Sequence, residues 1–310
     1  MATIQVTSGA DFDVLTNVTL VSGNVVPSGT AAVLIGPLNV LTGIESDGDH
    51  MTLRFDSVVG SPGSPIPFPS DFGPSSGGYN FDLSDFDGAT QLTGGDFGDV
   101  LTTGAGNDTL RGGGGSDTLI GNDGDDRFVI TSTPTKVEGG LGKDLLFIGS
   151  DSGAELNDDN FSGIEAIQVR SGSSLNMSGV SSGMTIKSAS TVDNSATIIG
   201  TSGADRIVAG KGSDTILGGA GNDKLFAGDG SNLFVFPEGN GRDNIYKFDI
   251  LEDRFAFGSD VSAFTDLKIG RTSGGDAVIT VIGDTDPSNK IIVHDVLPTS
   301  LTADHFMFGG

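Results

Sequence analysis

A nine-residue period constrains the fold of this chain more than any other feature of its sequence. Four consecutive units fill Gly94–Val129 (GGDFGDVLT, TGAGNDTLR, GGGGSDTLI, GNDGDDRFV), and four more fill Gly200–Val235 (GTSGADRIV, AGKGSDTIL, GGAGNDKLF, AGDGSNLFV). The sixth place of each unit is Asp, except in the last unit, and the eighth place is always apolar. A flexible Gly/Asp-rich linker does not need an apolar residue at every ninth position, so the period indicates a repeated structural unit.

Each unit divides into a turn-forming hexad and a three-residue strand. The first six places are rich in Gly, Asn and Asp. Glycine reaches positive φ without steric penalty, so the hexad can turn tightly and expose its carbonyls. The last three places form a short strand whose single apolar side chain points inward. Two units then make one coil, with turns on alternate sides. The sequence therefore predicts an all-β fold, a parallel β-roll or β-solenoid.

The spacing also predicts metal sites between the turns. Turns on the same side of such a roll are 18 residues apart, so their sixth-place residues stack. Calcium is a hard cation that takes about 6–8 oxygen ligands from carboxylates and main-chain carbonyls, and stacked turns offer both. The expected pairs are Asp99 with Asp117, Asp108 with Asp126, Asp205 with Asp223, and Asp214 with Asn232. The last pair is weaker, because the Asn side chain carries no charge.

Both arrays change where they end. The first continues in phase, with Thr135 at one acidic place and then Asp144, which pairs with Asp126. The second decays at PEGNGRDNI, where Asp243 comes two residues late and indicates a bulged last coil. Turn glycines add main-chain carbonyls, and we expect about five to seven calcium ions in all. The predicted ligands are Asp99, Asp108, Asp117, Asp126, Asp144, Asp205, Asp214, Asp223, Asn232, Asp243, Gly94, Gly104, Gly106, Gly113, Gly115, Gly203, Gly210, Gly212, Gly219 and Gly221.

The composition limits the partners of this chain. Its net charge is −25 and its pI is near 4.1, which excludes nucleic acid as a natural partner, because phosphate binding needs Lys and Arg patches. The charge should also expand the metal-free chain by self-repulsion. Cysteine is absent, so disulfides, thiol catalysis and Cys-based zinc sites are excluded. The N-terminal residues have no basic and apolar pattern of a Sec signal peptide, and no apolar stretch is long enough to span a membrane.

Changes in pattern along the chain suggest several regions. Short strands broken by turns predict a separate N-terminal β region, which could offer an assembly or binding surface. Its TSGAD and LTGIE sequences recur later in the chain, so early solenoid coils and coincidence both stay open. The expected divisions are 1–90 for this region, 91–147 for the first array, 148–199 for a metal-poor β-solenoid spacer, 200–257 for the second array with an aromatic cap, and 258–310 for a C-terminal β-hairpin and secretion signal region.

Together these motifs resemble the RTX family of calcium-binding proteins exported by type I secretion. The nonapeptides carry the resemblance, and the run Phe236–Phe255 with the closing LTADHFMF is similar to the family's capping and C-terminal secretion regions. The resemblance implies export through the type I secretion machinery by an uncleaved C-terminal signal. It also implies folding outside the cell, where calcium is millimolar, and a secreted or cell-surface location. A surface-layer or extracellular-matrix member of the family would fit.

The sequence gives no catalytic constellation. H-E-x-x-H is absent, and His50, His294 and His305 have no zinc spacing. Two formal G-x-S-x-G matches, Gly73–Gly77 and Gly179–Gly183, lie in Gly/Ser-rich surroundings that chance explains. We therefore expect no enzyme but a calcium-dependent structural protein that self-assembles as a homo-oligomer or lattice. The alternative is an adhesin that binds a surface or glycan through its N-terminal region, although the chain has no Trp and two Tyr to stack on sugars.

Overall fold

The computed structural model describes residues 81–84, 88–237, 239–259 and 261–308, together with the main chain of short strands before them. Among those earlier strands, β1 pairs with β4, β2 with β3, and β5 with β6, each antiparallel, and β6 then pairs in parallel with β7. Their bounds are β1 Ala2–Gln5, β2 Thr19–Val21, β3 Asn24–Val26, β4 Ala32–Ile35, β5 Val40–Ser46, β6 Met51–Asp56 and β7 Tyr79–Asp82. His50 and the Gly73–Gly77 match lie outside the described residues.

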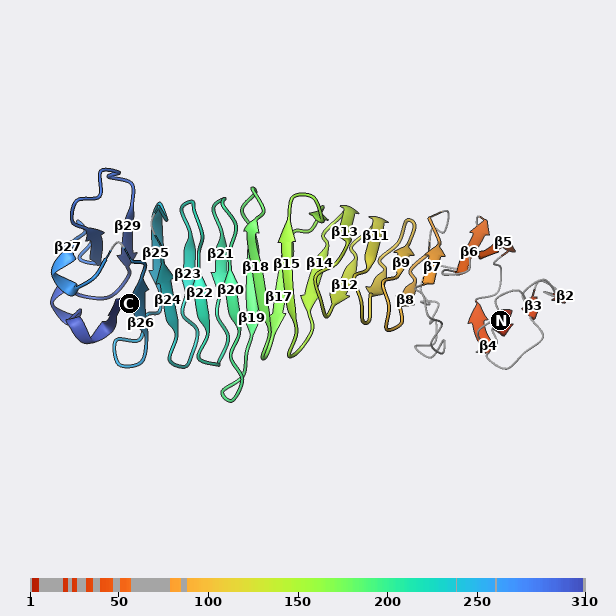
Figure 1. Ribbon diagram of the computed structural model, residues 1–310, viewed down its shortest axis with the longest axis horizontal. Coiled ribbons are helices and arrows are strands. Elements are labelled where there is room, and N and C mark those ends of the chain that lie inside the picture. The colour runs from red at the N-terminus through yellow and green to blue at the C-terminus, as the bar shows by residue number, and fades with distance from the viewer. Residues whose placement is uncertain are drawn as a thin grey trace. The chain divides into compact units, whose positions relative to one another are not determined.

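The chain divides into two compact units. The first comprises Met1–Phe147 with Asp159–Glu165, and the second comprises Ile148–Asp158 with Ala166–Gly310. Both are built from short, mostly parallel strands (Figure 1). The described residues contain three 3-10 turns and no α-helix, which confirms the predicted all-β class. None of these elements is a helix long and apolar enough to cross a membrane.

The first unit is a parallel solenoid in which alternate strands enter alternate sheets. Leu110 lies opposite Phe128 in one sheet, and Leu101 lies opposite Leu119 in the other, so neighbours in a sheet are one coil apart. The first sheet contains β8 Gln91–Thr93, β10 Thr109–Arg111, β12 Arg127–Ile130 and β14 Leu145–Ile148. The second contains β7, β9 Val100–Thr102, β11 Thr118–Asp123, β13 Lys136–Leu141 and β16 Phe161–Ser162.

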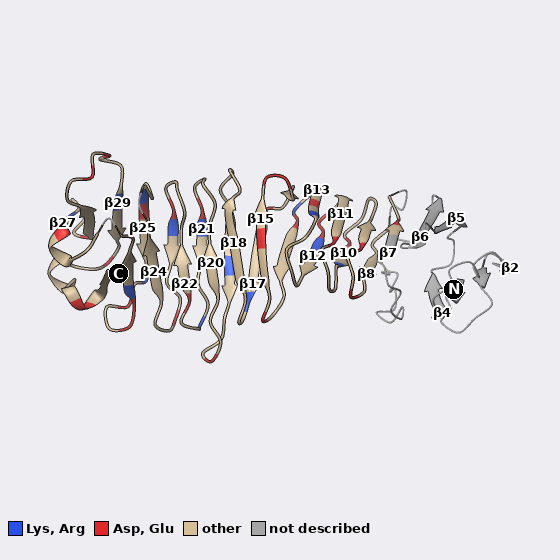
Figure 2. Ribbon diagram, viewed as in Figure 1, with Lys and Arg blue, Asp and Glu red and all other residues tan. Residues whose placement is uncertain are grey.

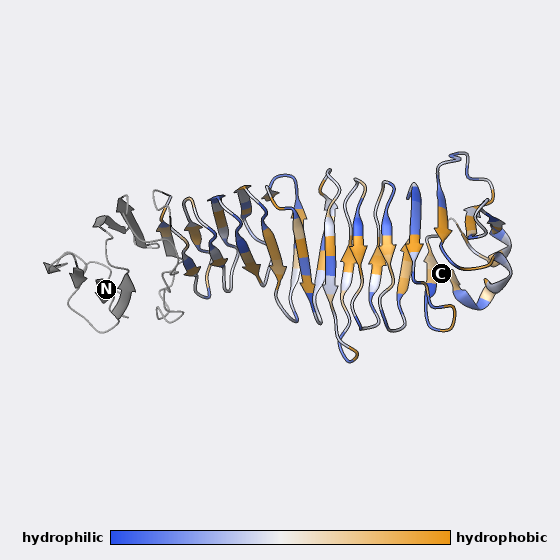
Figure 3. Ribbon diagram, turned by 180° about the vertical axis from the view of Figure 1, so that it is seen from behind, coloured by the Kyte–Doolittle hydropathy of each residue, from blue (hydrophilic) through white to orange (hydrophobic). Residues whose placement is uncertain are grey.

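Side chains that point inward from the two sheets form the core of the first unit. The three-residue strands alternate half-buried, buried and half-buried, with the eighth-place residue at the buried centre. Strands carry the apolar residues and turns the polar ones (Figure 3). The fully buried residues of this core include Leu92, Leu101, Leu110, Leu119, Phe128, Val137 and Leu146. One side chain per strand cannot make a core alone, so each coil depends on its neighbours.

The second unit repeats this arrangement with longer coils at its start. Its strands β17, β19, β21, β23, β25 and β29 pair in parallel in one sheet. Strands β15, β18, β20, β22, β24, β26 and β30 form the other. The bounds are β15 Gly153–Asn157, β17 Ala166–Arg170, β18 Ser174–Gly179, β19 Thr185–Ala189, β20 Thr197–Ile199, β21 Arg206–Val208, β22 Thr215–Leu217, β23 Lys224–Phe226, β24 Leu233–Phe236, β25 Arg242–Tyr246, β26 Arg254–Phe257, β29 Lys290–Val293 and β30 Phe306–Phe308.

An antiparallel hairpin and a group of phenylalanines complete the second unit. Strand β28 (Ala277–Val281) pairs antiparallel with both β27 (Leu267–Arg271) and β29. Stacked or tilted ring contacts run through Phe234, Phe236, Phe248, Phe255, Phe257 and Phe306. These side chains are all buried, so the last coil of the second array lies under an aromatic cover. The three 3-10 turns are η2 Phe264–Asp266, η3 Pro298–Ser300 and η4 Ala303–His305.

Candidate metal centre

Turns on the same side of the solenoid, one coil apart, are joined by a hydrogen bond between their sixth-place residues. The main-chain N–H of each donates to a side-chain Oδ1 in the turn one coil later. All five expected pairs are brought together in this way. The distances are 2.9 Å for Asp99 to Asp117, 2.8 Å for Asp108 to Asp126, 2.8 Å for Asp126 to Asp144, 2.8 Å for Asp205 to Asp223 and 3.0 Å for Asp214 to Asn232. Acidic residues recur along the coils (Figure 2).

The main-chain carbonyls of the sixth-place residues also form hydrogen bonds between coils, in the opposite direction along the stack. The carbonyl of Asp99 accepts the N–H of Thr118 at 2.7 Å, and the carbonyl of Asp108 accepts the N–H of Arg127 at 2.9 Å. Asp99 and Asp108 thus use both of their main-chain groups between coils. A carboxylate that accepts an N–H at Oδ1 is held in one direction, because it can direct only Oδ2 elsewhere.

Glycine at the first place lets the carboxylate approach the main chain. A Cβ at Gly112 would overlap Oδ2 of Asp117, so no larger residue fits while that carboxylate keeps its position. Gly113 follows with φ at +98°, in the left-handed region that glycine adopts readily. The predicted glycines all lie in the connections between strands, namely Gly94, Gly104, Gly106, Gly113, Gly115, Gly203, Gly210, Gly212, Gly219 and Gly221.

Five of the stacked carboxylates have an oxygen that nothing in the protein satisfies. These are the buried Oδ2 atoms of Asp108, Asp126, Asp144, Asp223 and Asp243. Loss of solvation on burial raises the pKa of Asp108 to about 6, of Asp243 to about 7, and of Asp126 and Asp223 to about 8. A buried carboxylate without a partner is costly. A cation at these oxygens would remove the cost, so the residues fit calcium.

Other members of the set are satisfied within their own turn. Oδ2 of Asp99 accepts the N–H of Gly95 at 2.6 Å, and Oδ2 of Asp205 accepts that of Thr201 at 2.6 Å. Asp214 has the same bond from the N–H of Gly210, at 2.9 Å. The eight carboxylates described so far thus include five with a free buried oxygen and three already bonded by a main-chain donor four residues earlier.

The ligands of any cation here must include main-chain carbonyls. Within the described ranges, no three His, Cys, Asp or Glu side chains gather closely enough to hold a metal by themselves. The turns supply the remaining oxygens from their glycine-rich hexads, a ligand type that calcium accepts and softer metals disfavour.

Sequence reasoning missed two carboxylates that extend these stacks. Oε2 of Glu165 accepts the N–H of Asp144 at 2.6 Å, and Oδ1 of the fully buried Asp253 accepts the N–H of Asn232 at 2.8 Å. Both follow their partner after 21 residues instead of 18. Asp243 similarly follows Asp223 after 20 residues, and the N–H of Asp223 donates to it at 3.0 Å. A search that allowed a longer last coil could have found both residues.

Where a stack has no carboxylate at the expected place, a hydroxyl group forms the hydrogen bonds instead. Thr135, at the acidic place of its unit, donates its hydroxyl to the carbonyl of Ser116 at 3.0 Å. At the other end of a stack, Thr90 donates its N–H and its hydroxyl to Oδ1 of Asp108, at 2.5 and 2.8 Å. An uncharged group thus stands at the N-terminal end of the row that begins with Asp108, whose other end is Glu165.

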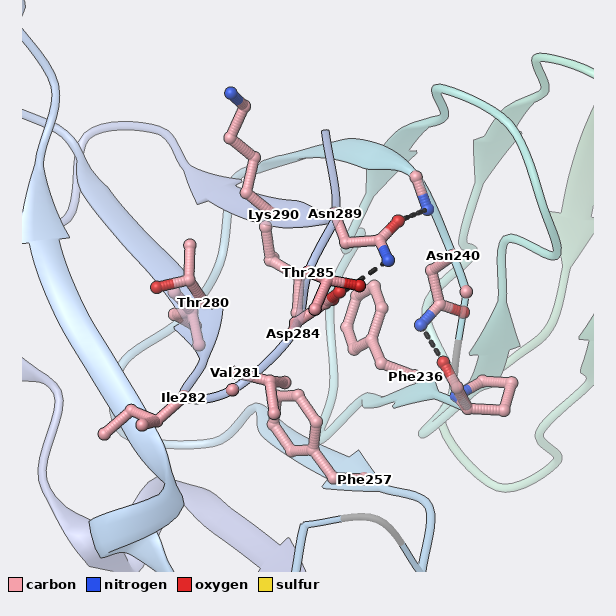
Figure 4. Close-up of a pocket in the computed structure, with 16 residues that line it drawn as sticks. Phe236, Asn240, Phe257, Thr280, Val281, Ile282, Asp284, Thr285, Asn289 and Lys290 are labelled. Atoms are coloured by element: carbon pink, nitrogen blue, oxygen red, sulfur yellow. Dashed lines mark hydrogen bonds between the residues drawn. The ribbon is translucent and has the colours of Figure 1, made fainter. Parts of the chain in front are cut away.

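The second unit also has a pocket of about 340 Å³ between its last turn and the hairpin (Figure 4). Phe236 and Phe257 line it, and Asn289 joins its two sides. Oδ1 of Asn289 accepts the N–H of Gly241 at 3.0 Å, and its Nδ2 donates to Asp284 at 2.9 Å. The described lining residues include no histidine and no cysteine. Its polar groups thus hold the hairpin against the turn.

Both described histidines have structural partners. His294 stacks on Tyr246 with ring centroids 4.3 Å apart, and its ring nitrogens contact Asn244 at 3.1 Å and Asp276 at 3.2 Å. Nε2 of His305 lies 2.9 Å from the carbonyl of Ile250. Nδ1 of His305 also lies 3.1 Å from the hydroxyl of Thr302.

The stacked carboxylates on parallel coils define a calcium-binding β-roll protein. A family model described as the RTX calcium-binding nonapeptide repeat (4 copies) matches the chain twice, over residues 93–128 and 199–234. The chain therefore carries RTX calcium-binding nonapeptide repeats, which confirms the resemblance in the sequence. No curated protein matches the chain.

Two solved structures are similar to parts of the chain. One is a subunit of the mannuronan C5-epimerase of Azotobacter vinelandii, with 20% identity and a TM-score of 0.33, over 41% of this chain and 88% of that one. The other is an extracellular lipase of Serratia marcescens, with 16% identity and a TM-score of 0.34, over 72% of this chain. The chain spans 40% of the length of the lipase.

Proposed function

We propose that this chain is a secreted, non-enzymatic structural protein that folds and self-assembles outside the cell when it binds calcium. One observation carries the proposal: five buried carboxylate oxygens have no partner in the protein. The metal-free fold must either bury these charges or protonate them. Calcium would remove the penalty, and it is abundant outside the cell and scarce inside it, so folding would follow export.

The residues proposed to hold the ions are the stacked carboxylates and the turn carbonyls. A bound calcium ion supplies positive charge between turns that otherwise present only oxygen atoms. The chain positions those oxygens in advance, because each N–H to Oδ1 bond fixes a carboxylate rotamer and each first-place glycine admits its second oxygen. Asp108, Asp126 and Asp144 form such a row in the first unit, and Asp223 and Asp243 form one in the second.

Self-assembly is supported by the end of the second unit. Within the described residues, β30 is the last strand of the seven-stranded sheet, and Met307 in it is 54% exposed. A strand with an open edge can pair with a strand of another copy. The net charge of −25 opposes such contacts between copies. Calcium bound in the turns would reduce the charge and so favour association.

The proposal is tested by following folding and association together during a calcium titration. Circular dichroism at neutral pH should show a partly folded chain in EDTA and a cooperative gain of β structure at millimolar calcium. Static light scattering on the same samples should show multimers only after that gain. Full β content in EDTA would contradict calcium-dependent folding, and monomers across the whole millimolar range would contradict assembly. Magnesium at equal ionic strength is the control for charge screening.

A further inference from the structure

Asn232 holds the last turn of the second array together with its side-chain amide. Nδ2 donates to the carbonyls of Asp229 at 3.2 Å and Gly230 at 3.1 Å, and to Oδ1 of Asp253 at 3.1 Å. Its Oδ1 accepts the N–H of Asp214 at 3.0 Å. One amide nitrogen thus lies among three oxygens, two from the main chain of its own turn and one from the next coil.

The orientation of this amide follows from its partners. Oδ1 faces an N–H donor, and Nδ2 faces three acceptors. Turning the amide over would set the NH2 group against the N–H of Asp214 and the oxygen against three other oxygens. Nitrogen and oxygen are therefore assigned by the hydrogen-bond network itself.

An Asp at the same place has no donor to offer. Oδ2 of Asp223, at the sixth place of the preceding unit, is buried without a partner, and so is Oδ2 of Asp243. A carboxylate supplies only acceptors, so oxygens gathered around it must be satisfied by a cation. An amide supplies two N–H donors of its own.

The neighbours of Asn232 in its stack are also satisfied without a metal. Oδ2 of Asp214 accepts the N–H of Gly210 at 2.9 Å and the hydroxyl of Ser190 at 2.8 Å. Oδ2 of Asp253 accepts the N–H of Asp249 at 2.8 Å. We call Asp214, Asn232 and Asp253 the amide column. It contrasts with the carboxylate column of Asp205, Asp223 and Asp243, two of whose members have a free buried oxygen.

We propose that the amide of Asn232 takes the place of a calcium ion, so that the amide column closes without metal while the carboxylate column requires it. The sequence expectation counted Asn232 among the ligands, and this inference gives it the opposite role. Calcium would then bind mainly along one side of the second array. The other side would tie the array to β26 at any calcium concentration. The inference rests on the proposed calcium-dependent folding for its contrast between the columns.

The first test introduces a carboxylate at this sixth place with the variant Asn232→Asp. This change removes the three donated bonds and restores the acceptor-only turn. The variant should bind about one more calcium ion per chain than the native protein, counted by native mass spectrometry of calcium-loaded samples. Asn222→Asp is the matched control, because it makes the same charge change in the neighbouring turn, where the Asn222 amide oxygen accepts the N–H of Arg242 at 3.0 Å. Its ion count should not change.

The second test needs no bound calcium. All four N–H groups concerned donate to the next residue of their own column, but only the amide column is satisfied without metal. Amide hydrogen exchange in EDTA should therefore be slower at Asp214 and Asn232 than at Asp205 and Asp223. Asn232→Ala should remove that difference and gain no ion. Equal exchange in both columns, or an unchanged count in a calcium-folded Asn232→Asp variant, would overturn the inference. A native chain that binds no calcium at all would overturn the proposed function, and the exchange in EDTA would still decide the role of Asn232.

Discussion

The main-chain N–H of Asp126 donates to Oδ1 of Asp144 at 2.8 Å, and each of these two residues has a buried Oδ2 without a partner. One oxygen of each carboxylate is therefore used for positioning and the other is left for a ligand. The first role needs only the repeat, whereas the second needs a cation. This division of the two oxygens gives several tests on single residues.

Asp126→Asn should weaken calcium binding while stabilising the metal-free fold. The Asn oxygen can still accept the N–H of Asp108, but the turn loses a charge shared between two neighbouring sites. Calcium affinity of the first array should fall at least about tenfold, a change of roughly 1.4 kcal/mol. Isothermal titration calorimetry measures it. Asp125→Asn, on an exposed neighbour, should leave the affinity within about twofold. Equal losses in both variants would point to overall charge instead.

The metal-free fold should be more stable in mild acid than in alkali. Burial raises the pKa of Asp126 and Asp223 to about 8. In the unfolded chain these groups have a pKa of about 3.9, so the folded state binds more protons from about pH 4 up to about pH 8. Stability in EDTA should therefore fall as the pH rises through that window. Circular dichroism in EDTA should show more β structure at pH 5 than at pH 8.5, and the reverse trend would contradict the raised pKa of these two carboxyl groups.

Calcium should reverse this dependence on pH. A ligand carboxylate must lose its proton before it can bind the ion, so calcium and protons compete for the same oxygens. The calcium concentration at the folding midpoint should rise as the pH falls from about 8 to about 5. Titrations at several pH values, followed by circular dichroism, measure the midpoint. A midpoint independent of pH would show that the buried carboxylates are not the ligands.

Gly112→Ala should damage the first array although it adds one methyl group. Its Cβ would overlap Oδ2 of Asp117, so the carboxylate would have to leave its place against the main chain. We expect a loss of about 1–3 kcal/mol in urea unfolding with calcium present. Gly274→Ala is the control, because its Cβ would meet its nearest neighbour at an ordinary 3.6 Å. A similar loss in both variants would indicate a general preference for glycine.

The repeat period was enough to predict the strand register and the paired residues. It did not predict whether the Oδ2 atom of each carboxylate has a hydrogen-bond partner. Asp108 and Asp214 occupy the same place in equal units, yet only Asp214 has its Oδ2 bonded to an N–H four residues earlier. Oδ2 of Asp214 also accepts the hydroxyl of Ser190, which lies 24 residues earlier and outside the repeat, so the nine-residue pattern does not reveal it. Glu165 and Asp253 escaped prediction for another reason. Longer coils preserve the stack while breaking the nine-residue count that reveals it.

Glu165 provides a test of whether a residue outside the repeat completes the first array. Glu165→Gln keeps an oxygen that can accept the N–H of Asp144 but removes the charge, so the effect should appear only with calcium. Calcium affinity of the first array should fall about tenfold, while hydrogen exchange at the Asp144 amide in EDTA stays unchanged.

Glu165→Ala removes the hydrogen bond as well, so exchange at Asp144 should speed up in EDTA and in calcium alike. Glu252→Gln repeats the charge change on an exposed residue of the second unit and should alter neither measurement. If Glu165→Gln binds calcium as tightly as the native chain and only Glu165→Ala changes the exchange at Asp144, Glu165 acts only as a hydrogen-bond acceptor. The stack of calcium ligands would then end at Asp144, where the nine-residue count also ends.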